Sequence, residues 1–149
     1  KRLRAAYLPN VTALQAAVFE SCAKLEIVQA ERCSFVGENC FCDCVSLKKL
    51  VMQPTEIKDC AFQNTRIPFL EFKSVVKIEG EAFYQAAIRE LVVPNCLQIA
   101  ENAFYGAMCT VKVVCGCESV ENMVKVEKIV SKSRQNSQLE KIAEAELDM

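Results

Sequence analysis

The residues with the greatest chemical potential in this 149-residue chain are its ten cysteines, and the chain contains no histidine. Without imidazole, Ser-His-Asp and Cys-His catalytic arrangements and histidine-bearing zinc sites are excluded. The spacing is also restrictive, because Cys40-x-Cys42-x-Cys44 and Cys115-Gly116-Cys117 are C-x-C patterns. Structural zinc sites usually use cysteine pairs with two or more residues between them. The cysteines therefore favour neither a metal site nor catalysis.

The overall composition narrows the class of protein further. Hydrophobic residues make up 52% of the chain and charged residues 25%, which predicts one domain, or two at most, that buries a core. Eighteen Lys and Arg residues against nineteen Asp and Glu residues give a formal charge of −1, which offers no basic field for nucleic acid. The apolar runs are too short to span a membrane, and no Gly-rich phosphate loop is present. We expect no cofactor and no membrane insertion.

A repeat of 21 or 22 residues organises most of the chain. Its marker is a small or apolar residue followed by a phenylalanine, and these phenylalanines are spaced by 22, 21, 21 and 21 residues: Phe19, Phe41, Phe62, Phe83 and Phe104. An aliphatic residue precedes each phenylalanine by five positions, and a small residue follows it by three. An L-x-x-L-x-L pattern comes next, from Leu25/Val28/Ala30 in the first copy to Met108/Val111/Val113 in the fifth.

Each repeat predicts one strand and one turn or short helix. The end of the L-x-x-L-x-L pattern alternates apolar and other residues, as a strand with one buried face does. The phenylalanine block carries apolar or small residues at i, i+1 and i+4, which suits one helical or 3₁₀ turn. A unit of this size cannot close a core alone, so the units must stack. We therefore expect an α/β repeat solenoid over residues 1–117, with parallel strands and short helices or turns.

The two ends of the chain carry separate expectations. Residues 3–10 match the end of a repeat, so the solenoid comprises a partial first repeat and five phenylalanine-bearing repeats, with part of an upstream repeat missing. The bare first strand would allow end-to-end self-association. Residues 118–149 contain no Gly, Pro or aromatic residue, and their apolar residues, Ile129 among them, fit helical faces. We expect a C-terminal helical cap or tail there; the alternative is a free helix that mediates self-association.

These motifs resemble the BspA-like leucine-rich repeat family, a Treponema-type variant with the unit I-G-x-x-A-F-x-x-C-x-x-L-x-x-I-x-I-P. The match is clear in the second and fourth copies: Val36-Gly37, Cys40-Phe41, Cys44, Leu47, Leu50 and Met52, then Ile78, Ala82-Phe83, Ile88, Leu91 and Val93-Pro94. The resemblance covers residues 3–114, although only Gly37 keeps the family glycine. It implies leucine-rich-repeat-like parallel strands. It also implies a non-enzymatic binding or adhesion protein, which favours a cell-surface or secreted location, while a cytoplasmic location stays open.

The repeat sorts the ten cysteines into two groups. Six stand in columns where other copies carry small or apolar residues, which predicts buried and inert side chains: Cys22, Cys33, Cys40, Cys44, Cys96 and Cys109. Cys42 and Cys60 stand in polar columns and are expected to be exposed, and Cys115 and Cys117 complete the candidates for chemistry. Cys42 and Cys60 could meet on adjacent turns as a disulfide, but two free thiols are the favoured interpretation.

The strands also define a candidate binding surface. With the leucine positions buried, the residues between them face the concave side as an apolar strip with a charged rim: Tyr7, Ile27, Lys49, Val51, Phe69, Glu71, Glu90, Val92 and Lys112. β-Propensity alone also favours Val, Ile and Phe in strands, so both interpretations stay open.

The favoured function is a non-catalytic module that binds a partner protein through this face, in adhesion or scaffolding. Glu79 and Glu81 are interpreted as solvated turn residues and not as a catalytic pair. The alternative function is a structural spacer whose C-terminal helix mediates assembly.

Overall fold

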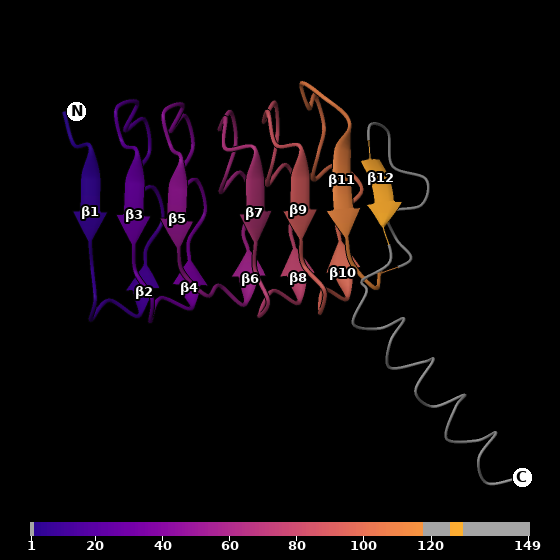
Figure 1. Ribbon diagram of the computed structural model, residues 1–149, viewed down its shortest axis with the longest axis horizontal. Coiled ribbons are helices and arrows are strands. Elements are labelled where there is room, and N and C mark those ends of the chain that lie inside the picture. Colours follow the sequence, from indigo (N-terminus) through magenta and orange to yellow (C-terminus); the bar gives the residue numbers. More distant parts are fainter. Residues whose placement is uncertain (1, 118–125, 130–149) are drawn as a thin grey trace, which may run out of the picture.

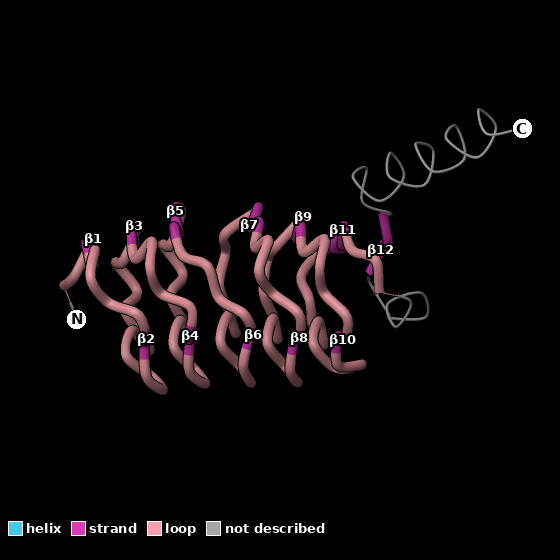
Figure 2. The backbone as a smooth tube through the Cα atoms, turned by 90° about the horizontal axis from the view of Figure 1, so that it is seen from below, coloured by secondary structure: helices cyan, strands magenta, loops and turns pink. Residues whose placement is uncertain are grey.

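The computed structural model describes residues 2–117 and 126–129, and this part of the chain forms a parallel β-solenoid (Figure 1). One row of strands, which we call the long-strand face, consists of β1 (Ala5–Tyr7), β3 (Ile27–Gln29), β5 (Lys49–Val51), β7 (Phe69–Glu71), β9 (Glu90–Val92), β11 (Val111–Val114) and β12 (Val126–Ile129). A second row of two-residue strands consists of β2 (Ala13–Leu14), β4 (Phe35–Val36), β6 (Glu56–Ile57), β8 (Lys77–Ile78) and β10 (Gln98–Ile99). Figure 2 shows the two rows on opposite sides of the stack.

The core lies between the two rows, and the repeat columns fill it as the sequence predicts. The central residue of most long strands points inward, and Val28, Leu91 and Val113 have no exposed surface. The short strands contribute their second residue, for example Ile57 and Ile78, each 1% exposed. Because side chains alternate along a strand, the residues on either side of these positions face solvent. All strand pairs are parallel, which confirms the expected stacking of units.

The five repeat phenylalanines form one continuous stack through the solenoid. Successive ring centroids from Phe19 to Phe104 lie 5.6, 5.4, 5.4 and 5.2 Å apart, and the interplanar angles fall from 15° to 6°. The backbone follows the same step. The N–H of each of the first four phenylalanines donates to the carbonyl of the residue before the next one, at 2.8–3.0 Å. Ring stacking and backbone hydrogen bonds therefore hold the turns at one pitch.

The phenylalanine blocks are turns, which is one of the two expected forms. The described residues contain no helix, so the α/β class expected for the solenoid is not supported there. Residues two positions before and after each of the first four repeat phenylalanines adopt positive φ, as Cys60 (56°) and Asn64 (52°) do around Phe62. Left-handed residues on both flanks interrupt the right-handed run that a helix needs. Bonds from Gln63 N to the Cys60 carbonyl and from Thr65 N to the Phe62 carbonyl close tight turns instead.

Most of the predicted C-terminal helix, residues 118–149, lies outside the described residues. The prediction is wrong for Val126–Ile129, which form strand β12. This strand pairs in parallel with β11, from Val111 with Val126 to Val114 with Ile129. An edge strand presents unpaired backbone groups, and pairing with the next segment satisfies them. The pairing partner, and not the local apolar periodicity, determines the structure of these four residues.

The last repeat is displaced from its predicted register by two residues. The sequence pattern equates Val111 with Leu91, but β11 pairs Val113 with Leu91 and Lys112 with Glu90. Met108, assigned to the first leucine position, is 58% exposed. The displacement keeps the alternation of side chains because it spans an even number of residues. Lys112 therefore still faces solvent, but one column away from the expected one.

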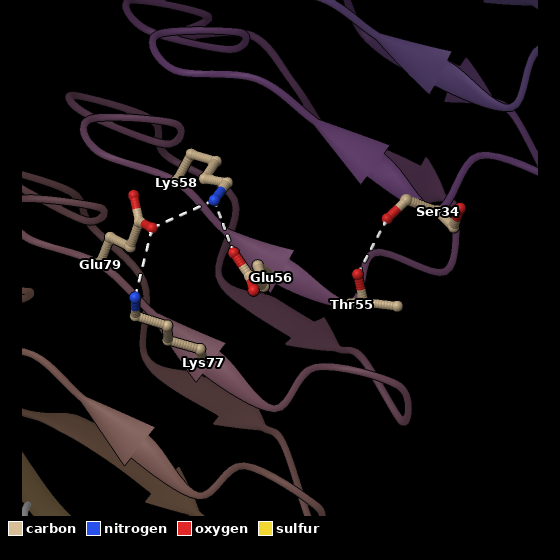
Figure 3. Close-up of polar contacts among 6 residues, drawn as sticks. All are labelled: Ser34, Thr55, Glu56, Lys58, Lys77 and Glu79. Carbon is tan, nitrogen blue, oxygen red and sulfur yellow. Dashed lines mark hydrogen bonds and ion pairs between the residues drawn. The ribbon is translucent and has the colours of Figure 1, made fainter.

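A seam divides the stack between the second and third phenylalanine-bearing repeats. Within residues 2–117, no strand pairing joins β5 to β7 or β4 to β6. On the long-strand face, Pro68 occupies the same repeat position as Lys48 and Arg89. The N–H groups of Lys48 and Arg89 donate to carbonyls just before the preceding long strand, those of Glu26 and Pro68. Proline has no N–H, so Pro68 cannot make this bond. On the other face the N–H and hydroxyl of Thr55 both donate to the Ser34 carbonyl, at 3.1 and 3.4 Å, and bridge the seam (Figure 3).

Amide hydrogen exchange should report this seam. Phe69 and Glu71 of β7 occupy the same register positions as Glu90 and Val92 of β9, but no strand pairs with them on the β5 side. We expect the Phe69 and Glu71 amides to exchange about tenfold faster or more than those of Glu90 and Val92, because their opening requires no strand separation. Exchange measured by NMR would test this, and equal protection of both pairs would contradict an open seam.

Gly37 is required by a close backbone contact. A Cβ at this position would lie 2.5 Å from the Ala16 nitrogen, whereas the nearest atoms to a Cβ at Gly80 belong to side chains, with Asn102 Oδ1 at 3.1 Å and Asp59 Oδ1 at 3.5 Å. We expect Gly37→Ala to lower the free energy of unfolding by about 1–3 kcal/mol, because backbone atoms of the adjacent turn must move. The Gly80→Ala control should change it little, because a side chain can rotate away. Urea unfolding of both variants would decide, and equal stability of Gly37→Ala and wild type would contradict the contact.

Candidate interaction surface

The long-strand face carries all nine residues of the predicted binding strip at positions that solvent reaches. Tyr7 is 62% exposed and Phe69 is 49% exposed. The other exposed members are charged: Lys49, Glu71 and Lys112. Four members are half-buried between neighbouring strands: Ile27, Val51, Glu90 and Val92. Strand alternation explains the arrangement, because each of these residues flanks a strand centre that points into the core.

Strand register determines which members of the strip lie side by side. Ile27 lies beside Lys49, and Tyr7 and Val51 flank Gln29 in the next column. These four strip residues belong to the β1–β3–β5 sheet. The seam separates them from the remaining five, which β7, β9 and β11 carry. The structure thus assembles the strip as two halves.

In the second half, Phe69 lies beside Glu90, and Glu90 lies beside Lys112. The register of β11 also adds a residue that the sequence pattern missed. Val114 pairs with Val92, in the column that the sequence assigned to Lys112, and it is half-buried. Only strand pairing reveals this residue, because the pattern of the last repeat suggests a different alignment.

Sequence reasoning also missed apolar side chains on the opposite side of the solenoid. Phe35 is 43% exposed, Val76 40% and Leu97 74%, on or next to the short strands. Val76 and Leu97 share a column in which the other three copies carry Ser or Thr, and the other copies carry Ala13 or polar residues at the Phe35 position, so neither column is apolar throughout. Val76 and Leu97 are neighbours in adjacent repeats, because the Leu97 N–H donates to the Val76 carbonyl at 2.9 Å, whereas Phe35 belongs to a separate repeat.

All ten cysteines are free thiols. Five of the six predicted core cysteines are buried, and Cys109 is half-buried with its Sγ 3.1 Å from the Ile88 carbonyl. The prediction of an exposed Cys42 is wrong, because its side chain is only 5% exposed. Tyr84 and Tyr105 in the same column are long enough to reach solvent, whereas the short cysteine side chain is covered by the adjacent turns. Cys60, also predicted to be exposed, is half-buried.

The buried thiols are poor nucleophiles. Burial raises the pKa of Cys40, Cys44 and Cys96 to about 12. Burial and the nearby Asp43 carboxylate raise the pKa of Cys42 to about 11. Cys115 and Cys117, the other two candidates for chemistry, are buried as well. Because thiolates and not thiols react, the raised pKa makes Cys40, Cys42, Cys44 and Cys96 less reactive.

The carboxylates near the short strands are held in ion pairs (Figure 3). Lys58 Nζ lies 2.6 Å from Glu56 Oε2 and 3.1 Å from Glu79 Oε1, and Lys77 Nζ lies 3.6 Å from Glu79 Oε1. The hydrogen bond from Lys58 lowers the pKa of Glu56, and the bonds to Glu56 and Glu79 raise the pKa of Lys58. Glu81 is exposed as expected, whereas Glu79 is half-buried in this network instead of being solvated.

Neither a metal site nor a membrane span is found in residues 2–117 and 126–129. No group of three or more Cys, Asp or Glu side chains there is placed to hold a metal ion. This part of the chain also contains no helix with the length and hydropathy needed to cross a bilayer.

Parallel strands stacked at a repeat of about 21 residues, with a column of buried phenylalanines and one open strand face, define a leucine-rich repeat solenoid. A family model for the BspA type leucine-rich repeat region matches residues 2–111 in six copies, so the chain belongs to this family. No curated protein and no solved structure matches the chain. Repeats of this family are in general protein-interaction modules, and the fold is typically non-catalytic.

The raised thiol pKa values predict a loss of stability in alkaline solution. The folded pKa of Cys40, Cys44 and Cys96 is about 12 against an ordinary value of 9.0, so the unfolded chain releases these protons first as the pH rises. Their contribution to stability is complete below about pH 9 and is lost progressively between about pH 9 and pH 12. The melting temperature of wild type should therefore fall more steeply above about pH 9 than that of a variant without the three thiols.

A matched variant follows from the repeat columns, where other copies carry Ala at the Cys40 and Cys44 positions and Val at the Cys96 position. The triple variant Cys40→Ala/Cys44→Ala/Cys96→Val keeps those columns apolar. Melting curves at a series of pH values would compare the two proteins. Parallel curves above about pH 9 would show that the thiols do not stay protonated in the folded state.

Proposed function

We propose that this chain is a non-catalytic interaction module that binds a partner protein through the long-strand face, in adhesion or scaffolding. The observation that carries the proposal is the pair of large aromatic side chains, Tyr7 and Phe69, that are exposed on the long-strand face. Removing such rings from water is favourable, so a partner that covers them gains binding energy. Exposed aromatic side chains are the residues that most often dominate binding energy at interfaces.

The surroundings of these two rings fit a protein partner. Half-buried aliphatic residues, Ile27, Val51 and Val92, extend the apolar surface along the strip. Lys49 and Glu71 place charges of both signs beside them, which matches the apolar centre and polar rim of protein interfaces. Burial of apolar area contributes about 25 cal/mol per Å², so two partly exposed aromatic rings supply a substantial part of a binding energy.

A catalytic role has no support in the described residues. Burial raises the pKa of Cys40 and Cys42, and Glu56 and Glu79 are ion-paired with lysine. A general acid or a nucleophile needs a pKa near the working pH or an activating base. The family in general consists of interaction modules, which supports binding over catalysis.

Charge substitutions in the strip test the proposal. We expect Tyr7→Asp/Phe69→Asp to abolish capture of a binding protein from the source organism, because the two acids would need to be desolvated within the interface. The melting temperature should stay close to that of wild type, since both side chains are largely exposed. The immobilised wild-type and variant chains would be compared by quantitative mass spectrometry of the captured proteins.

The matched control is Leu97→Asp, which places the same charge on a 74% exposed apolar residue away from the long-strand face. It should leave capture unchanged. Equal capture by wild type and the double variant would eliminate this face as the binding surface, and so would equal losses from the double variant and the control.

A further inference from the structure

We propose that the partner binds with an acidic segment, directed at the edge of the strip where the long strands begin. This inference rests on the proposed function and specifies the chemistry of the partner. It follows from the distribution of charge along the solenoid, in which acidic and basic side chains occupy different columns of the repeat. A repeat protein extends any such column into a continuous row, because each copy adds one residue at nearly the same position.

The strand-start edge is basic. Six exposed basic side chains lie on it, just before a long strand or at its beginning: Arg4, Lys48, Lys49, Arg66, Arg89 and Lys112. The acidic residues of the same edge, Glu26 and Glu90, are both half-buried. Glu26 Oε1 lies 3.8 Å from Arg4 and 4.0 Å from Lys48, so its charge is shared between two bases. The exposed charge on this edge is therefore predominantly positive.

The phenylalanine turns carry the opposite charge. The six-residue turns from three positions before each phenylalanine to two after it contain no Lys or Arg. They contain six acidic residues: Glu20, Glu38, Asp43, Asp59, Glu81 and Glu101. Lys and Arg equal Asp and Glu in number over residues 2–117, so this is a separation of charge and not an excess of one sign. It gives the solenoid an acidic turn row and a basic strand-start edge.

This separation selects the charge and the orientation of a partner. An acidic segment is attracted by the strand-start edge and repelled by the turn row, so it approaches the strip from one side. Lys49 and Lys112 belong to both the edge and the strip. Lys49 lies beside the aliphatic Ile27, and Lys112 lies one strand beyond Glu90, the neighbour of Phe69. Arginine in particular can bind a carboxylate through two parallel hydrogen bonds. An apolar segment flanked by Asp and Glu satisfies both features of the surface.

The test uses random displayed peptides of about 12 residues, selected on the immobilised wild-type chain. The enriched peptides should combine apolar residues with an excess of Asp and Glu. Their affinity should fall as the salt concentration rises from about 0.05 M to about 0.5 M, because salt screens exposed charges. Arg66→Glu/Arg89→Glu should weaken binding about tenfold or more, since these two exposed bases would become repelling charges.

The matched control is Arg32→Glu, compared with the single variant Arg89→Glu; it makes the same change in net charge at an exposed residue beyond the other end of the long strands. It should change the affinity less than about twofold. Equal losses from both variants, or enriched peptides without an acidic excess, would overturn the inference while leaving the proposed function intact.

The proposed function fails separately if Tyr7→Asp/Phe69→Asp does not weaken the binding of the peptides. Displacement of the peptides by a thymidine oligonucleotide that binds more tightly would assign the edge to nucleic acid and also overturn the inference.

Discussion

Stacking of one phenylalanine on the next is the interaction on which the rest of this solenoid depends. The rings follow each other at 5.2–5.6 Å through all five turns. The stack continues between Phe41 and Phe62, where both rows of strands lose their pairing. The backbone bond from Phe41 N to the Ala61 carbonyl also crosses there, at 2.9 Å. The turn layer is thus continuous where the sheets are not, because it needs no N–H at the position that Pro68 occupies.

One pitch for every turn has a direct consequence for the surface. When units stack in register, a residue type at one position of the repeat becomes a row that runs along the molecule. The basic strand-start edge and the acidic turn row both arise in this way. The molecule can therefore have nearly equal numbers of acids and bases and still present a strongly polarised surface to a partner.

The same stacking makes most of the cysteines structural. Cys40 stands where other turns carry alanine, and Cys44 where they carry alanine or threonine. Thr65 shows how a polar group fits this column, because its hydroxyl donates to the Phe62 carbonyl at 2.8 Å. Cys44 does the same across turns, with its Sγ 3.0 Å from the Phe19 carbonyl. A thiol here behaves as a small apolar side chain that can also donate a weak hydrogen bond, and burial keeps it protonated.

The sequence by itself determined the repeat, the buried columns, the parallel strands and the residues of the exposed strip, because a column must stay apolar in every copy to fill the core. Tertiary structure alone decided the features that depend on neighbouring turns or strands. Burial at i, i+1 and i+4 in the phenylalanine blocks fits turns and helices equally, and it is the positive φ of residues such as Cys60 and Asn64 that makes these blocks turns. Contact between turns buried Cys42, and strand pairing set the register of Val113 and made Val126–Ile129 a strand. Periodicity reports which side chains are buried, whereas backbone conformation and register follow from partners that are distant in the sequence.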